Sequence, residues 1–215
     1  MNAALSRRRR PTVTIGFVGA CVLVYLLGFI YQPMLADFCF IPALARAEPY
    51  RFLTSAFLHA DLSHIFLNSW SLIVLGLALE PILGPARYGL LLLASALGGN
   101  VAVLAFASPY HPDWITPVVG ASGAAFGLFG ALIVFGRHQS RSTFVLLIIL
   151  LLANLGNTMF ARSISWQSHL GGLAVGMILT GLYFLCGRRK ALAILAGLAL
   201  TAALGYAGWH LALPY

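Results

Sequence analysis

Two residues in apolar parts of the chain have side chains that could act as a nucleophile and its base. Ser122 lies in the run Gly120-Ala121-Ser122-Gly123, and His169 lies in a separate apolar segment. A serine hydroxyl is a weak nucleophile until a base takes its proton, and histidine is the side chain most often used for that purpose. No carboxylate is close to His169 in the sequence, so the pattern predicts a Ser–His dyad without an acid.

Two polar side chains in an earlier apolar segment could assist such a dyad. His64 and Asn68 are spaced i, i+4, so a helix would present both from one face. With the backbone N–H of Ser122 they could form an oxyanion hole, which stabilises the charge of a tetrahedral intermediate. Glu80 ends the same segment, and there we expect a structural role in capping or bridging helices.

Each of these residues also has a purely structural interpretation. A Gly-Ala-Ser-Gly run commonly serves close helix packing in membranes, and Gly123, Gly127 and Gly130 fit that use. A single intramembrane histidine can be a hydrogen-bonded structural residue, and a His–Asn pair can tie two helices together. The other histidines lie near predicted membrane edges and are expected to be solvated: His59, His111, His138 and His210.

The composition places these groups in a membrane. Of the 215 residues, 60% are hydrophobic and only 8% are charged, whereas a soluble domain carries about 25% charged residues. We therefore expect an integral membrane protein of one domain. The cysteines Cys21, Cys39 and Cys186 lack metal-ligand spacing and no cofactor fingerprint appears, so we expect no metal, no cofactor and no disulfide framework.

Apolar runs separated by polar breaks give seven candidate transmembrane helices, since about 20 mainly apolar residues cross a bilayer. The first could be a signal peptide, but it is longer than a signal-peptide core and lacks a small-residue cleavage site. The stretch Gln32–Asp61 becomes a long loop, and such loops are often functional. The expected spans are residues 13–31, 62–79, 88–106, 122–136, 143–159, 167–186 and 191–213.

The basic residues indicate the orientation of these spans. A cytoplasmic N-terminus puts ten of the thirteen Lys and Arg residues inside, and only Arg46, Arg51 and Arg162 outside, as the positive-inside rule requires. The C-terminus then lies outside. Because the basic charge sits at membrane edges, a nucleic-acid surface is excluded despite the net charge of +8.

Helix rise places the candidate residues at a common depth. Counted from the inner ends of their segments at about 1.5 Å per residue, Ser122 lies roughly 22 Å, His64 about 24 Å and His169 about 27 Å from the inner edge. With a hydrocarbon core of about 30 Å, all three fall in its outer third. A helix that begins at Ser122 also needs partners for its buried N–H groups, which a water-lined cavity or surrounding protein can supply.

The motifs resemble those of the rhomboid family of intramembrane serine proteases, over residues 49–176. The second apolar segment is similar to the family's His-x4-His-x3-Asn, and His169 is followed by glycines as in its His-x2-Gly-x3-Gly. The matching residues are Tyr50-Arg51, His59 with His64 and Asn68, Glu80 with Gly84, Gly120-Ala121-Ser122-Gly123, and His169 with Gly172 and Gly176.

The resemblance implies an all-α, polytopic transmembrane bundle with a six-helix core and a C-terminal seventh helix. It implies that Ser122 attacks a peptide bond, that His169 is the general base, and that His64, Asn68 and the Ser122 N–H form the oxyanion hole. It further implies that Gly172 lets two helices pack closely and that Arg51 helps to hold the first outer loop. The regions are then residues 1–12, a basic cytoplasmic N-terminus, 13–186, the catalytic core, and 187–215, a basic loop with the seventh helix.

The sequence departs from the family pattern at two positions. Phe126 stands where many relatives have a tyrosine that stacks on the catalytic histidine, so stacking is retained and the hydroxyl is lost. Tyr50 replaces a tryptophan that the family often has, one amphipathic aromatic for another.

The expected partners are transmembrane protein substrates and the lipid bilayer, in a bacterial inner membrane, with the oligomeric state left open. A protein that binds membrane clients without cleaving them is the main alternative. A small transporter is a weaker one, because no repeat symmetry appears between the halves of the sequence.

Overall fold

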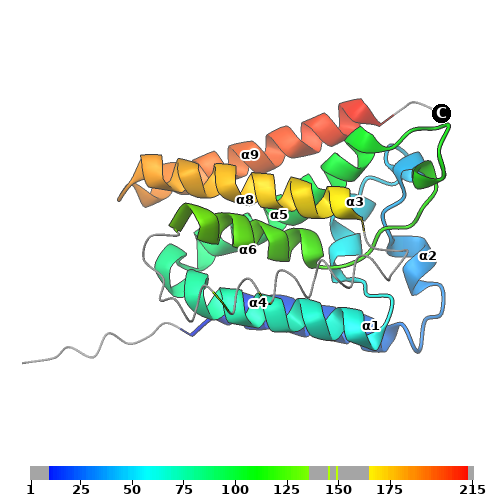
Figure 1. Ribbon diagram of the computed structural model, residues 1–215, viewed down its shortest axis with the longest axis horizontal. Coiled ribbons are helices and arrows are strands. Elements are labelled where there is room, and N and C mark those ends of the chain that lie inside the picture. Colours follow the sequence, from blue (N-terminus) through cyan, green and yellow to red (C-terminus); the bar gives the residue numbers. More distant parts are fainter. Residues whose placement is uncertain (1–9, 136–144, 146–148, 150–164, 213–215) are drawn as a thin grey trace, which may run out of the picture.

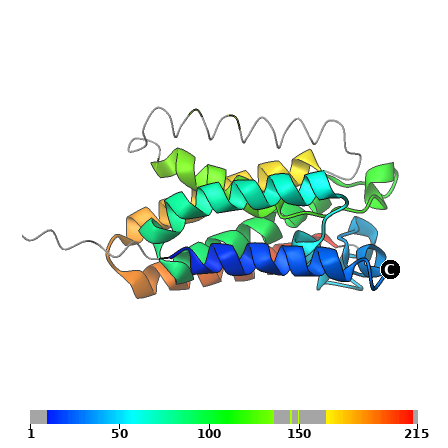
Figure 2. The ribbon, with the colours of Figure 1, turned by 90° about the horizontal axis from the view of Figure 1, so that it is seen from below.

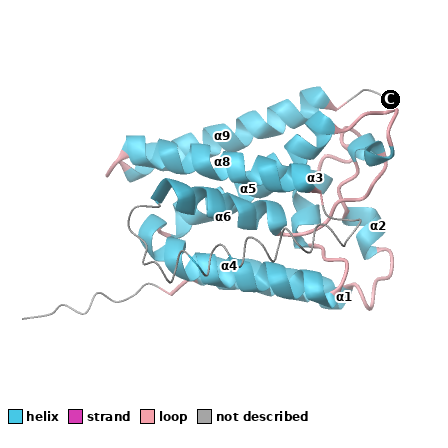
Figure 3. Cartoon of the chain, viewed as in Figure 1, coloured by secondary structure: helices cyan, strands magenta, loops and turns pink. Residues whose placement is uncertain are grey.

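The computed structural model describes residues 10–135, 145, 149 and 165–212. Within these ranges the chain is a helical bundle without a β-strand (Figures 1 and 3). The only pairing of extended backbone there is an isolated antiparallel bridge between Phe40 and Val118. The predicted all-α class is confirmed.

Four helices in the described part of the chain are long and apolar enough to cross a membrane: α4 (Leu62–Leu83), α5 (Pro85–Phe106), α8 (Trp166–Cys186) and α9 (Lys190–Leu211). Two further apolar helices, α1 (Thr12–Leu27) and α6 (Ser122–Phe135), are shorter. Several large apolar side chains on the outside of the bundle are exposed, among them Leu77, Leu185 and Leu195. Long apolar helices with such a surface define a multi-pass membrane protein.

Helix α6 is the central element of the bundle. It packs against α4, α5 and α8, while α1 lies against α4, and α9 covers α5 and α8 on the outside (Figures 1 and 2). Every residue of α6 from Ser122 to Leu132 is buried. At 14 residues and a rise of about 1.5 Å per residue, α6 is roughly 21 Å long. Its first residue, Ser122, is only 6% exposed, so this end of α6 lies inside the bundle.

The segment between α1 and α4, called the α1–α4 loop (residues 28–61), gathers at one end of the bundle (Figure 1). It contains four short elements: α2 (Met34–Phe38), η1 (Pro42–Leu44), α3 (Arg51–Thr54) and η2 (Ser55–Phe57). A further short helix, η3 (Pro112–Trp114), lies between α5 and α6. The predicted long loop is thus a folded structure.

Several helix boundaries differ from the expected spans. Helix α1 ends at Leu27, before Gly28, whereas residue 31 was expected. Helix α4 continues past residue 79 through Pro81 and ends at Leu83, with Gly84 as its C-cap. A proline in the last turn removes only one hydrogen bond, and Gly84, with a φ of 78°, ends the helix instead. Of the expected span 143–159, the structure describes only Val145 and Ile149, both helical, and His138 lies outside the described residues.

Candidate active site

Three helices begin at the same end of the bundle, and each carries a candidate residue in its first turn or just after it. His64 is the third residue of α4, Ser122 the first of α6 and His169 the fourth of α8. Asp61 caps α4, because its carboxylate accepts the N–H of His64 at 2.8 Å. Ser165 caps α8 by accepting from the Ser168 N–H at 3.4 Å. The positive ends of three helix dipoles therefore meet around these residues.

The backbone just before α6 lies against His64 and Asn68. Gly120 has a φ of 123°, and its N–H donates to the Ser55 carbonyl at 2.9 Å. A Cβ at this position would be 2.6 Å from Nε2 of His64 and 3.5 Å from Nδ2 of Asn68. Glycine is thus required at 120 both for the backbone conformation and for the space. The structure thereby brings the two side chains of α4 to the start of α6.

Glycines hold α6 and α8 in backbone contact one turn further along. A Cβ at Gly172 would lie 2.1 Å from the carbonyl oxygen of Gly123, and one at Gly176 would lie 2.0 Å from that of Gly127. From the other helix, a Cβ at Gly130 would lie 2.3 Å from the carbonyl oxygen of Leu173. Only glycine permits such an approach, which is typical of small-residue interfaces in membranes.

The aromatic ring of Phe126 stacks on His169. Their ring centroids are 4.0 Å apart and the planes are within 6° of parallel. Ser122 lies one turn before Phe126 on the same face of α6, since residues i and i+4 are neighbours on a helix. The histidine is therefore held over the face of α6 that also carries the serine.

The side chains of His64, Asn68 and His169 are buried and lack hydrogen-bond partners among the described residues. His64 and His169 are each 3% exposed and Asn68 is 1% exposed. Neither ring nitrogen of either histidine, and neither polar atom of the Asn68 side chain, has a hydrogen-bond partner among the described residues. Leaving buried polar groups unpaired costs about 1–3 kcal/mol each, so such groups in a native protein call for an explanation, such as ordered water or a catalytic role.

His59 is buried, although the sequence led us to expect a solvated side chain. It is only 3% exposed, and its ring meets that of His64 edge-on with centroids 5.0 Å apart. It also lines a pocket of about 220 Å³ together with Tyr25 and Gln32. Burial, with a smaller contribution from the positive charge of His64, lowers the pKa of His59 to about 3. His59 lies in the α1–α4 loop just before α4, and the packing of that loop buries it. Its place in the sequence next to an apolar run does not reveal this burial.

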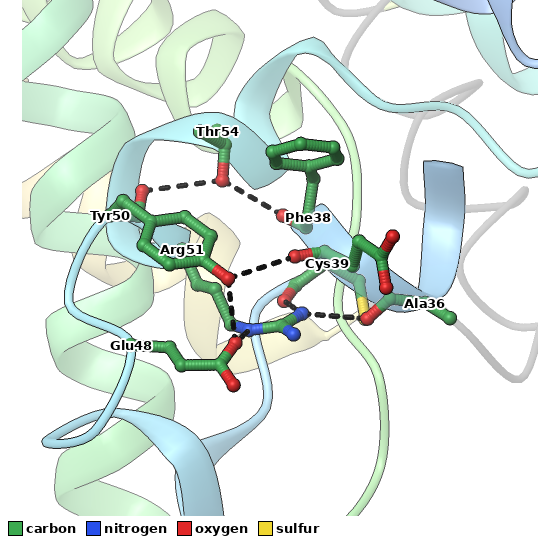
Figure 4. A network of polar contacts seen from close by, with 8 residues as sticks. Ala36, Phe38, Cys39, Glu48, Tyr50, Arg51 and Thr54 are labelled. Carbon is green, nitrogen blue, oxygen red and sulfur yellow. Dashed lines mark hydrogen bonds and ion pairs between the residues drawn. The ribbon is translucent and has the colours of Figure 1, made fainter. Parts of the chain in front are cut away.

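Arg51 holds the α1–α4 loop together (Figure 4). Its Nη1 donates to the carbonyls of Ala36 and Cys39, each at 2.8 Å, and its Nε pairs with the Glu48 carboxylate. The hydroxyl of Tyr50 donates to the same carboxylate at 2.7 Å. Hydrogen bonds from Tyr50 and Arg51 lower the pKa of Glu48. Arg51 is only 5% exposed. Its guanidinium thus connects Ala36, Cys39 and Glu48 of the loop to α3.

Glu80 lies at the opposite end of α4 and caps α1. Its carboxylate accepts the N–H groups of Val13 and Thr14, each at 2.9 Å, and the Thr14 hydroxyl at 2.7 Å. A negative charge at a helix N-terminus also interacts favourably with the helix dipole. Glu80 therefore has a structural role, far from the cluster around Ser122.

Asn100 is a positioning residue that the sequence analysis overlooked. It is 4% exposed, and its Nδ2 donates to the Phe52 carbonyl and to the Ser55 hydroxyl, each at 2.8 Å. Ser55 in turn accepts the N–H of Gly120. Asn100 thereby connects α5 through Ser55 to the start of α6. The signal was available, because a polar amide within an apolar helix indicates a specific role.

Among the described residues, no group of three His, Cys, Asp or Glu side chains could hold a metal ion. The three cysteines are free. The groups gathered around the start of α6 are a serine hydroxyl, imidazole rings, a side-chain amide and helix N-termini.

The fold and the buried polar cluster define a multi-pass helical membrane protein with a polar site enclosed at one end. The Rhomboid domain profile matches residues 46–187. The chain belongs to the rhomboid family, as its motifs indicated.

Individual relatives cover different shares of their own length. The chain is 31% identical over 187 residues to rhomboid protease GluP of Bacillus subtilis (strain 168), covering 81% of this chain and 35% of GluP. It is 34% identical over 156 residues to the rhomboid-family protein YdcA of the same organism, covering 68% of this chain and 72% of YdcA. Human Rhomboid-related protein 3 is 31% identical over 152 residues, covering 62% of this chain and 36% of that protein. The chain thus spans about a third of the length of GluP and of the human relative.

Proposed function

We propose that the protein is an intramembrane serine endopeptidase that cleaves transmembrane proteins near the membrane edge at which α4, α6 and α8 begin. Membership of the family and the relative named as the protease GluP support this proposal. The observation that carries it is the buried cluster at the start of α6, where the Gly120 backbone meets His64 and Asn68 and where His169 stacks on Phe126.

The proposed reaction begins with attack by the Ser122 hydroxyl oxygen on a peptide carbonyl carbon, while His169 takes the hydroxyl proton. The tetrahedral intermediate collapses, the amine leaves with that proton, and an acyl ester remains on Ser122. Water then attacks the ester with His169 again as the base, which releases the carboxylic acid and restores the serine. No acid is needed to orient the imidazole, since Phe126 holds its ring plane.

The oxyanion of each intermediate would accept hydrogen bonds from three donors: a ring N–H of His64, the side-chain amide of Asn68 and the backbone N–H of Ser122. Donors held in place before the reaction stabilise the transition state because they need not reorganise. The positive end of the α6 dipole adds to this stabilisation. Helix α6 starts below the ends of its neighbours, and a cavity there would supply the water for hydrolysis.

The proposed orientation has the N-terminus in the cytoplasm, the C-terminus outside and the cluster near the outer face of a bacterial inner membrane. Charge supports it. Four of the five acidic residues, Asp37, Glu48, Asp61 and Asp113, lie in the loops at the cluster end or at the start of α4. Of the seven described Lys and Arg residues, Arg46 and Arg51 lie at the cluster end. The other five, Arg10, Arg87, Arg188, Arg189 and Lys190, lie at the opposite end, and this excess is what the positive-inside rule expects of a cytoplasmic side.

The test is proteolysis of single-span membrane proteins by the purified full chain in detergent and in liposomes. Test substrates should carry glycine or proline near the outer membrane edge, because a helical peptide carbonyl is shielded until the helix unwinds. Cleavage by the wild type and its loss in Ser122→Ala and in His169→Ala are expected. Unchanged cleavage by either variant would refute the dyad. Substrate binding by a folded wild type without any product would instead support a client-binding protein.

A further inference from the structure

A basic pocket lies at the end of the bundle opposite the Ser122 cluster. It has a volume of about 290 Å³ and is formed where the α4–α5 turn meets the start of α9. Two cationic side chains, Arg87 and Lys190, line it, and no acidic side chain does. Its other walls are apolar or glycine: Pro81, Ile82, Leu83, Gly84, Pro85, Ala86 and Ile194.

The surroundings of the pocket favour an anion. Helices α5 and α9 both begin at it, and neither has a capping side chain at its N-terminus. Free N–H groups and the positive dipole end at a helix start both attract negative charge. The one nearby carboxylate, Glu80, is 3% exposed and already accepts hydrogen bonds from α1. The positive charge of the pocket is therefore not neutralised by the protein.

Two of the carbonyl groups at the end of α4 already accept hydrogen bonds within the protein. The carbonyl of Glu80 accepts the N–H of Gly84 at 2.8 Å, and that of Leu83 accepts Nε of Arg87 at 2.6 Å. The second bond leaves the other guanidinium nitrogens of Arg87 available to a ligand, because arginine has five N–H donors in all. The Arg87 guanidinium also makes a cation–π contact with Tyr183, 6.0 Å from the ring centroid.

The position of the pocket identifies the source of the anion. It lies at the ends of long apolar helices, where the hydrocarbon core gives way to lipid headgroups. Its rim includes Ile82, which is 52% exposed, next to the exposed Pro81 and Pro85. Cations beside exposed apolar side chains suit a molecule that carries a phosphate on an apolar body. Basic pockets between transmembrane helices bind anionic lipid headgroups in this way.

We propose that this pocket binds the headgroup of an anionic phospholipid from the leaflet at this end of the bundle. The phosphodiester contacts Arg87 and Lys190, and the upper part of the acyl chains lies against Ile82 and Ile194. Such a lipid would bridge the α4–α5 turn and the start of α9.

The test is native mass spectrometry of the purified full chain, titrated with phosphatidylglycerol or with phosphatidylcholine. The wild type is expected to prefer phosphatidylglycerol. Because a basic residue near an anionic lipid surface contributes about a fivefold gain in binding, Lys190→Gln should reduce the preference about fivefold. Lys190→Arg, which keeps the charge, should retain it. Lys190 is exposed at the start of α9, so neither substitution disturbs the core.

Arg10→Gln is the matched control, because it removes one exposed charge at the same end of the bundle but outside the pocket. It should leave the preference unchanged. Equal binding of the two lipids by the wild type would overturn the proposal, as would equal losses in Lys190→Gln and Arg10→Gln. Displacement of phosphatidylglycerol by millimolar inorganic phosphate would also overturn it, since the pocket would then be a site for free anions.

Discussion

Adding one methyl group at Gly172 should severely slow the proposed proteolysis while leaving the fold in place. The new Cβ would lie 2.1 Å from the carbonyl oxygen of Gly123, about 1.3 Å inside the 3.4 Å at which ordinary contact begins. That oxygen belongs to the backbone of α6 and cannot turn aside, so α8 must move away by about 1 Å. His169 lies one turn earlier on α8 and moves with it. A misplacement of about 1 Å at a reacting group can cost 10²-fold in rate.

The assay is turnover of a cleavable transmembrane substrate by Gly172→Ala, with thermal unfolding measured in the same detergent. Turnover should fall about 10²-fold, and the free energy of unfolding by about 1–3 kcal/mol, as is usual for overpacking. The matched control is Gly181→Ala on the same helix, where an added Cβ meets nothing within 4 Å. Wild-type turnover in Gly172→Ala would refute the claim that contact between α6 and α8 positions the histidine.

Three further substitutions test other parts of the structure. Asn68→Ala should lower turnover by about 10²–10³ with little change in thermal unfolding, because it removes one of the proposed oxyanion donors; normal turnover would exclude that role. Glu80→Gln should reduce the free energy of unfolding by about 1.5–3 kcal/mol, since a charged acceptor of two α1 N–H groups is lost, and an unchanged melting temperature would contradict it. Burial holds the pKa of His59 down from 6.5 to about 3 in the folded protein. As the pH falls below 6.5, His59 therefore takes up a proton in the unfolded chain but not in the folded protein. The free energy of unfolding is highest above pH 6.5 and falls between pH 6.5 and 3 by at most about 1.4 kcal/mol per pH unit. His59→Gln should remove that part of the acid dependence of thermal unfolding, and an unaltered dependence would exclude His59 as its source.

Much of the fold could be predicted because its signals are local. Apolar runs and their polar breaks placed the long helices, and helix rise placed His64, Ser122 and His169 in one layer. The start of each of these three helices, at Leu62, Ser122 and Trp166, lies within one residue of the prediction. The C-terminal ends of the helices were harder to predict. Pro81 usually breaks a helix, but it lies in the last turn of α4, where it removes only one hydrogen bond.

The α1–α4 loop could not be predicted, because its order depends on contacts between residues far apart in the sequence. Arg51 reaches back to the carbonyls of Ala36 and Cys39, and Phe40 pairs with Val118 in the loop before α6. The burial of His59 follows from this packing and has no local signal. Asn100 differs, since a buried amide in an apolar helix could have been recognised from the sequence alone.

The central claim is that Ser122 is a nucleophile activated by His169. The most direct measurement is covalent labelling of the folded full chain by a fluorophosphonate, with the adduct located by peptide mass spectrometry. The claim predicts one adduct, on the peptide that contains Ser122, and its loss in His169→Ala with the thermal unfolding profile retained. An unlabelled wild type that is folded and cleaves substrate, or a His169→Ala variant labelled at the wild-type rate, would contradict it.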